Sequence, residues 1–268
     1  MDANLNARIV TGAVALPILV WLVGWSPGWS FTVAILIVTV AALREFFAMV
    51  FPRAWKDQCL GILFGMAFSA PVFFEQQLYV THWLGILFLI GFSVCLWTPG
   101  ELAERLNRLL FSLLGGIYAG FLLPHWALLF RQPNGRAWTF WVLAVVMIGD
   151  TVAYFVGRRF GVRKLAPQIS PGKTVEGAWG YIAGAVAAGG VTATFLFVRF
   201  SWVEILMLSL IIGILGQLGD LFESWIKRVF AVKDSGQLLP GHGGLLDRLD
   251  SLIFPAVFTS TYLRVFHS

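Results

Sequence analysis

The stretch that decides the fold runs from Gly219 to Ser251 and reads GDLFESWIKRVFAVKDSGQLLPGHGGLLDRLDS. The chain is 58% hydrophobic, yet this stretch holds nine of its 33 charged side chains, of which 19 are basic and 14 acidic. Charge beside a membrane-embedded helix is costly and usually serves a function. We therefore interpret the stretch as a functional site at the ends of membrane helices.

Polar side chains recur in this stretch with the spacing of a helix face. Two sets share the offsets 0, 3 and 4: Asp220, Glu223 and Ser224, and then Asp247, Asp250 and Ser251. A loop containing Lys, Arg, His and Gly separates the two sets. Carboxylate oxygens without clustered cysteines suit Mg²⁺, alone or with a second metal ion, better than zinc. The pattern predicts Asp220, Asp247 and Asp250 as metal ligands, and a helix that begins at about Leu245 would place the last two in its first turns, where the dipole favours negative charge.

The composition indicates a membrane protein. Only 12% of the 268 residues are charged, whereas soluble domains carry about 25%. We predict an all-α, polytopic integral membrane protein embedded in a lipid bilayer, with no soluble domain. The net charge of +5 does not indicate a nucleic-acid partner, because basic residues in membrane proteins mostly record orientation.

Apolar runs of roughly 20 residues predict membrane spans, and the chain holds about nine of them. Between the fourth and fifth, we expect Trp97–Arg108 to form a loop and a short surface helix. The predicted unit has N-terminal helices in residues 1–136 and C-terminal helices, carrying the site, in residues 137–268. The nine predicted spans are Ile9–Trp25, Phe31–Val50, Cys59–Phe74, Trp83–Trp97, Leu109–Leu123, Ala137–Val156, Ala178–Val198, Val203–Leu221 and Leu245–Val265.

Charge in the loops predicts the orientation of these spans. With nine spans, 15 of the 19 basic residues fall on the side of the N-terminus and four on the other side. Basic loops stay in the cytoplasm. We therefore expect a cytoplasmic N-terminus, a multi-pass protein of the inner (cytoplasmic) membrane, and a site that faces the cytoplasm.

A second polar loop, residues 157–177, falls on the same side and contains ISPGKTVEG. Beside a Pro-Gly turn, this loop offers three hydrogen-bond donors for a phosphate group: Ser170, Lys173 and Thr174. The loop lacks the Walker A pattern. Attraction of a basic juxtamembrane loop to anionic lipid is the alternative. Asp150 precedes this loop as Asp220 precedes the other, and it either lines the site or pairs with a neighbouring Arg.

Both loops resemble one known family. The stretch Gly219–Ser251 closely resembles the signature of phosphatidate cytidylyltransferases, also called CDP-diacylglycerol synthases. Its matching positions are Ser224, Lys227, Arg228, Lys233, Asp234, Gly236, Pro240, His242, Gly243, Gly244, Asp247, Arg248 and Asp250. The second loop is similar to the family's Ser-Pro-x-Lys-Thr-x-Glu-Gly element, matched by Ser170, Pro171, Lys173, Thr174, Glu176 and Gly177. Asp150, Ala153, Tyr154, Gly157, Arg158 and Gly161 also match the family.

The resemblance implies a nucleotidyltransferase of phospholipid biosynthesis. Its reaction joins CTP and membrane phosphatidate to give CDP-diacylglycerol and pyrophosphate, by magnesium-dependent attack of the lipid phosphate on the α-phosphate of CTP. The expected catalytic residues are Asp220, Ser224, Lys227, Asp247 and Asp250. The expected substrate-binding residues are Ser170, Lys173, Thr174, Arg228, Lys233, His242 and Arg248.

Other functions fit parts of the pattern. A CTP-dependent lipid-alcohol kinase would transfer the terminal phosphate instead, and a transporter or flippase would place its charges near the bilayer midplane. Phosphatidyltransfer is disfavoured because the Asp-Gly-x2-Ala-Arg pattern is absent from the sequence. The glycines of residues 180–190 permit close helix packing, either within the chain or in a homodimer.

Overall fold

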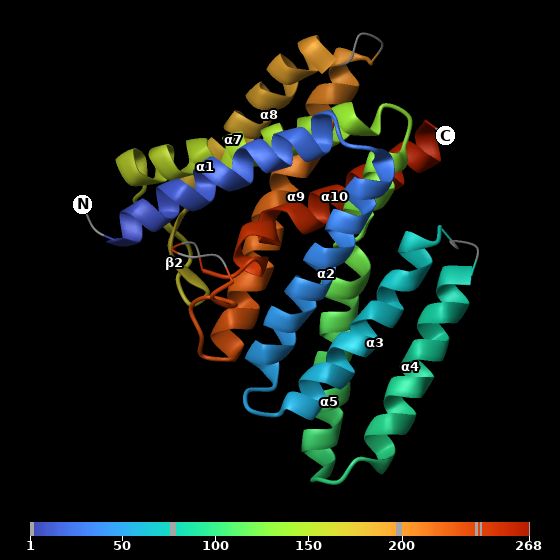
Figure 1. The fold of residues 1–268 in the computed structure, drawn as a ribbon. Helices are drawn as coiled ribbons and strands as arrows, with labels where there is room; N and C mark the ends of the chain where they lie inside the picture. The colour runs from blue at the N-terminus through green and yellow to red at the C-terminus, as the bar shows by residue number, and fades with distance from the viewer. Residues whose placement is uncertain (1–2, 76–78, 197–199, 239–240, 242, 268) are drawn as a thin grey trace.

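The computed structural model describes residues 3–75, 79–196, 200–238, 241 and 243–267, and from residue 12 onward it also describes side chains. Most of this part of the chain is helical (Figure 1). The helices are α1 (Ala3–Gly24), α2 (Gly28–Val50), α3 (Trp55–Phe73), α4 (Val80–Trp97), α5 (Leu102–Gly115), η2 (Gly116–Leu122), α6 (His125–Arg131), α7 (Gly135–Phe160), α8 (Val175–Leu196), α9 (Trp202–Val229) and α10 (Leu246–Phe266). A short antiparallel hairpin, β1 (Lys164–Ala166) and β2 (Ser170–Thr174), joins α7 to α8.

The predicted membrane fold is confirmed. Within the described residues, six helical segments are long and apolar enough to cross a membrane: α2, α4, the rod Leu102–Arg131, α7, α8 and α9. Each of the nine predicted spans coincides largely with a helix. The number of spans that cross the membrane and the side of the N-terminus stay predictions.

The segment between the fourth and fifth predicted spans agrees with expectation in part. Residues 98–101 form the expected loop and an exposed helical stretch follows it, but this helix is not short: α5 begins at Leu102 and continues through η2 and α6 as one 30-residue rod. The Leu, Ala, Glu and Arg residues of its first turns favour helix even though they are polar enough to resemble a surface segment. Gly120 brings this rod against α3, since a Cβ atom there would overlap the carbonyl oxygen of Gly65.

The buried side chains form two clusters that place the site. One surrounds Trp138 and Trp141 of α7 and extends to α8, α9 and α10. The other surrounds Phe46 and Phe47 of α2 and includes Ile226 of α9 and Leu246 of α10. The second cluster therefore holds α2, from the N-terminal part of the chain, against the helices that carry the acidic stretch.

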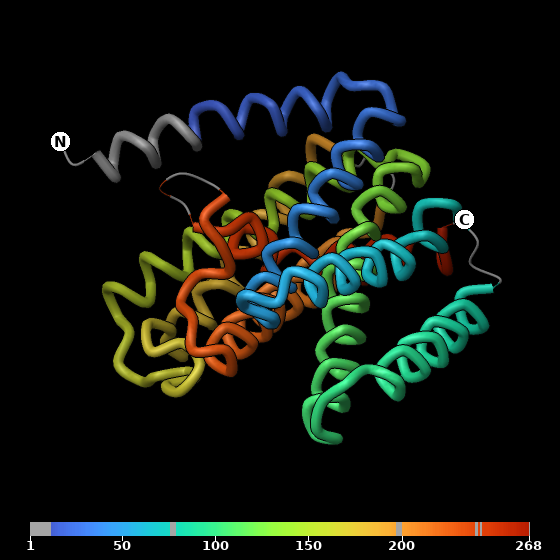
Figure 2. Tube along the Cα trace, turned by 60° about the horizontal axis from the view of Figure 1, so that its bottom comes forward, coloured from blue at the N-terminus to red at the C-terminus, as the bar shows by residue number. Residues whose placement is uncertain are grey.

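Helix α4 lies outside this buried centre and is largely exposed. Figures 1 and 2 both show α4 at one edge of the bundle, and it packs on α3 and α5. Only Leu87 and Gly91 of α4 are buried, so most of its apolar surface is available to lipid.

The glycines of α8 serve packing on α7 within the chain. Cβ atoms added to Gly180 and Gly184 would come 2.8 Å from Val156 and Val152 of α7.

Candidate active site

A cavity of about 380 Å³ lies where the two polar loops of the sequence meet. Lys173 of β2 and Asp220 of α9 both line it, and their Nζ and Oδ2 atoms are 2.5 Å apart. Two segments that the sequence places almost fifty residues apart therefore form one site. Other lining residues are Asp150, Tyr154, Arg158, Thr174 and Tyr181.

The β-hairpin positions Lys173. Lys164 of β1 pairs with Thr174, and the Glu176 carboxylate at the start of α8 accepts the Val162 N–H at 3.0 Å. The Thr174 hydroxyl is buried and accepts the Gly177 N–H at 3.1 Å, which caps α8. Thr174 thus has a structural role beside the predicted substrate contact, whereas Ser170 pairs with Ala166 and is not part of the cavity lining described.

Aspartates from three helices lie near one another at the site: Asp150 and Asp220 line the cavity, and Asp250 is buried close to Asp220. Asp150 of α7 and Asp250 of α10 each lie within electrostatic range of Asp220. The Ser224 hydroxyl donates to Asp220 Oδ1 at 3.3 Å, and the Ser251 hydroxyl donates to Asp150 Oδ2 at 3.4 Å. The predicted face of α9 and the predicted first turns of α10 therefore meet, with Asp150 beside them.

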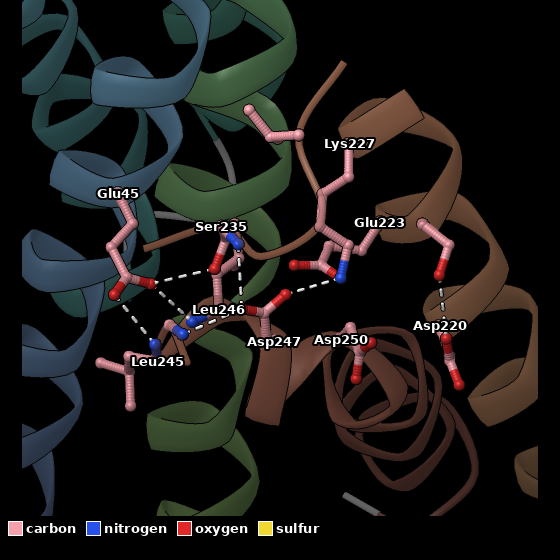
Figure 3. Close-up of polar contacts among 12 residues, drawn as sticks. Glu45, Asp220, Glu223, Lys227, Ser235, Leu245, Leu246, Asp247 and Asp250 are labelled. Carbon is pink, nitrogen blue, oxygen red and sulfur yellow. Dashed lines mark hydrogen bonds and ion pairs between the residues drawn. The ribbon is translucent and has the colours of Figure 1, made fainter. Parts of the chain in front are cut away.

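Lys227 is the cation at the centre of the α9–α10 contact (Figure 3). Its Nζ atom lies 2.6 Å from Asp247 Oδ1 and also pairs with Glu223 one turn earlier. The Glu223 side chain is 0% exposed and the Lys227 side chain 10%. Burying an ion is costly unless it is paired, so this lysine balances carboxylates that would otherwise destabilise the fold.

Asp247 holds the glycine-rich loop. Its Oδ2 atom accepts the N–H groups of Ser235 and Gly244, both at 2.9 Å. With Lys227 on Oδ1, both carboxylate oxygens have partners (Figure 3). Its role as a metal ligand stays a prediction.

Glu45 of α2 is the site residue that the sequence reasoning missed. It is buried, and its carboxylate accepts the Leu245 and Leu246 N–H groups at 2.9 Å and the Ser235 hydroxyl at 3.3 Å. An ionisable residue inside the predicted span Phe31–Val50 was the signal, because such residues usually serve a function.

Of the predicted site residues that the structure describes, Lys173, Thr174 and Asp220 line the cavity, whereas Ser224, Lys227, Asp247 and Asp250 lie in the adjoining α9–α10 contact. Arg228 donates to the carbonyl oxygens of Ile169 and Val232, both at 3.1 Å, and so ties the end of α9 to the hairpin. Lys233 and Arg248 are exposed. His242 and Pro240 lie outside the described residues.

The donor chemistry of the site fits a divalent cation. Across residues 3–75, 79–196, 200–238, 241 and 243–267, no three His, Cys, Asp or Glu side chains form a metal-holding group. Five acidic side chains nevertheless adjoin two lysines, which leaves an excess of negative charge on hard oxygen donors. The acids are Asp150, Asp220, Glu223, Asp247 and Asp250, and the lysines are Lys173 and Lys227.

Comparison with known proteins decides the family. The model of the cytidylyltransferase family matches residues 6–266. The chain belongs to this family. It is 36% identical to the phosphatidate cytidylyltransferase of Brucella abortus, over 98% of this chain and 95% of the relative. The phosphatidate cytidylyltransferase of Bacillus subtilis is 33% identical over 98% and 99%, and that of Synechocystis sp. 32% over 85% and 86%.

These matches extend over the whole bundle. The resemblance first seen in the two polar loops is confirmed, and with it the prediction of an enzyme of this transferase family. The match also includes α1–α6, for which the sequence alone offered only hydropathy.

Proposed function

We propose that this chain transfers the cytidylyl group of CTP to phosphatidate. A phosphate oxygen of phosphatidate forms a bond to the α-phosphorus of CTP, while the bond between the α-phosphorus and the bridging oxygen breaks. The electron pair leaves with pyrophosphate, and CDP-diacylglycerol remains in the membrane. The names of the relatives support this choice of substrates.

One observation carries the proposal: Lys173 of one polar loop and Asp220 of the other meet in one cavity, and a second lysine–aspartate pair, Lys227 and Asp247, joins α9 to α10 nearby. Transfer between two polyanions requires fixed positive charge around the reacting phosphates. Lys173 borders the cavity and would bind a phosphate of CTP or of the lipid. Ser224 and Lys227, one and two turns after Asp220 on α9, would contact the reacting phosphates.

The site has no need of a strong general base. A phosphate monoester has a second pKa of about 6, so the lipid nucleophile is largely ionised at neutral pH. The aspartates are then free to hold a cation. We propose Asp220, Asp247 and Asp250 for this role, with Asp150 beside Asp220 as a further oxygen donor.

Magnesium is the proposed cofactor. When bound, it would supply positive charge that offsets the charge of the CTP phosphates and of departing pyrophosphate. Lys173 and Lys227 now neutralise Asp220 and Asp247. A cation held by these aspartates would leave both ammonium groups available to substrate phosphates.

We propose that the cavity faces the cytoplasm, at the headgroup level of the inner membrane. The distribution of basic residues in the sequence supports this orientation. Soluble CTP would then enter from one side and phosphatidate from the bilayer.

Label transfer tests the proposed reaction. Purified protein receives phosphatidate, Mg²⁺ and CTP labelled on the α-phosphate, and the organic phase is counted. We expect label in lipid that EDTA abolishes. Label that enters an isoprenoid alcohol from γ-labelled CTP, and not from α-labelled CTP, would refute nucleotidyl transfer in favour of a lipid kinase. Absence of both from folded protein would favour transport.

A further inference from the structure

Glu45 is remote in sequence from the acidic stretch but is in contact with it. The residue lies in the last turns of α2, is only 7% exposed, and points at the start of α10 (Figure 3). Its two oxygens accept three hydrogen bonds, from Leu245 N, Leu246 N and Ser235 Oγ. No residue of the recognised motifs lies on α2.

Glu45 and Asp247 hold the same segment from opposite sides. The Ser235 hydroxyl donates to Glu45, while the Ser235 N–H donates to Asp247. Asp247 in turn binds Lys227. A continuous polar path therefore runs from α2, through the loop, to the cation between α9 and α10.

The surroundings leave little freedom for this contact. A Cβ atom on Gly236 would come 2.6 Å from Glu45 Oε1, and one on Gly244 would come 2.8 Å from Glu45 Oε2. Glycine at both positions lets the backbone approach the carboxylate. The first N–H groups of a helix also lack partners within the helix, and their dipole favours an anion. Glu45 therefore suits the start of α10 in both hydrogen bonding and charge.

We propose that Glu45 is a positioning residue for cytidylyl transfer. By holding Ser235 and the start of α10, it fixes the placement of Asp247 and, through it, of Lys227. The catalytic part of this inference rests on the proposed function, whereas the contact itself does not. It also gives α2 a direct part in the site, beyond its packing in the bundle.

The substitution Glu45→Gln tests the proposal. Arg44→Gln is the control, because it changes the adjacent, exposed charge on the same helix. The amide retains the size of the side chain but places N–H groups opposite backbone donors. Hydrogen exchange of the peptide spanning residues 243–247 reports the contact, with peptides of α7 and α8 as internal references for global folding. The values of kcat and of KM for CTP are measured on the folded fraction, with CTP varied and phosphatidate saturating.

We expect Glu45→Gln to speed exchange at residues 245 and 246, with α7 and α8 unchanged, and to lower kcat by roughly 10–100-fold with little change in KM for CTP, as for other residues that orient a reacting group. Arg44→Gln should match wild type in both. Because Ser235 is the shared link, Ser235→Ala should lower kcat less in the Glu45→Gln background than in wild type.

Two outcomes would overturn the proposal: exchange that does not change in Glu45→Gln, or faster exchange with wild-type kcat. If Glu45→Gln does not fold, Glu45→Asp replaces it in the test, because aspartate retains the carboxylate on a shorter side chain. A wild-type kcat in Glu45→Asp would contradict the proposal. If the wild-type protein itself transfers no cytidylyl group, the proposed function fails, while hydrogen exchange still tests the contact.

Discussion

Replacing Lys227 by Met removes the cation at the α9–α10 contact while preserving the approximate size of the side chain. In wild type, its ammonium group pairs with Glu223 and with Asp247, whose side chains are 0% and 8% exposed. Among the described residues, Glu223 has no hydrogen-bond donor besides this ion pair. Asp247 still keeps the N–H groups of Ser235 and Gly244. Most of the loss therefore falls on Glu223.

Removing one partner of a buried ion pair costs about 3–5 kcal/mol, because an uncompensated charge remains. In a chain of this size, each kcal/mol lowers Tm by about 2–4 °C, so Lys227→Met should melt roughly 6–20 °C below wild type. Adding Glu223→Gln removes the orphaned charge and should recover part of the loss. Tryptophan fluorescence melts of the three proteins in one detergent measure both effects.

Arg228→Met is the matched control, since Arg228 lies next in sequence but is exposed and binds only backbone carbonyls in the described residues. It should melt within about 4 °C of wild type, as a surface change of about 1 kcal/mol would. The reasoning fails if Lys227→Met melts like wild type. It also fails if Glu223→Gln lowers the Tm of the Lys227→Met protein further.

Two further substitutions test the packing and the capping that place the site. Gly120→Ala should destabilise by about 1–3 kcal/mol, because its Cβ atom would overlap the Gly65 carbonyl, whereas Gly85→Ala, with open space around it, should be neutral or slightly stabilising in the same melts. Thr174→Ala should cost about 1 kcal/mol through the lost cap of α8, and Thr174→Ser should not. If Thr174 only caps the helix, KM for CTP will stay constant in both threonine variants; a rise confined to Thr174→Ala would instead support the predicted substrate contact.

Local pattern was sufficient for much of the fold. Apolar runs predicted where the helices lie, and the 0, 3, 4 spacing predicted that Asp220 and Ser224 share a face, which their hydrogen bond confirms. The start of α10 at Leu246 agrees with the expected start near Leu245. These features depend on residues within a few turns of one another. The predicted division of the bundle into N-terminal helices, residues 1–136, and C-terminal helices, residues 137–268, stays a prediction.

Contacts between distant segments were beyond the same reasoning. Nothing in α2 itself shows that Glu45 meets Leu245, which is 200 residues away, because that contact depends on how Phe46 and Phe47 pack against α9 and α10. Likewise, the sequence predicted that Asp247 lies near the start of a helix. It did not predict that Ser235 and Lys227 donate to the oxygens of its carboxylate. The all-α prediction also did not include the hairpin that carries Lys173, because a three-residue strand is too short to show an alternating pattern.

The most direct test of the central claim measures one turnover of α-labelled CTP into phosphatidate, in liposomes with Mg²⁺, for Asp220→Asn and Asp57→Asn. Asp57 is an acidic residue of α3 beside Arg108, at a separate cavity. The proposed mechanism predicts a rate at least about 100-fold below wild type for Asp220→Asn, with an unchanged melt, and a near-normal rate for Asp57→Asn. Near-normal transfer by folded Asp220→Asn would contradict the assignment of this acidic cluster as the site of cytidylyl transfer.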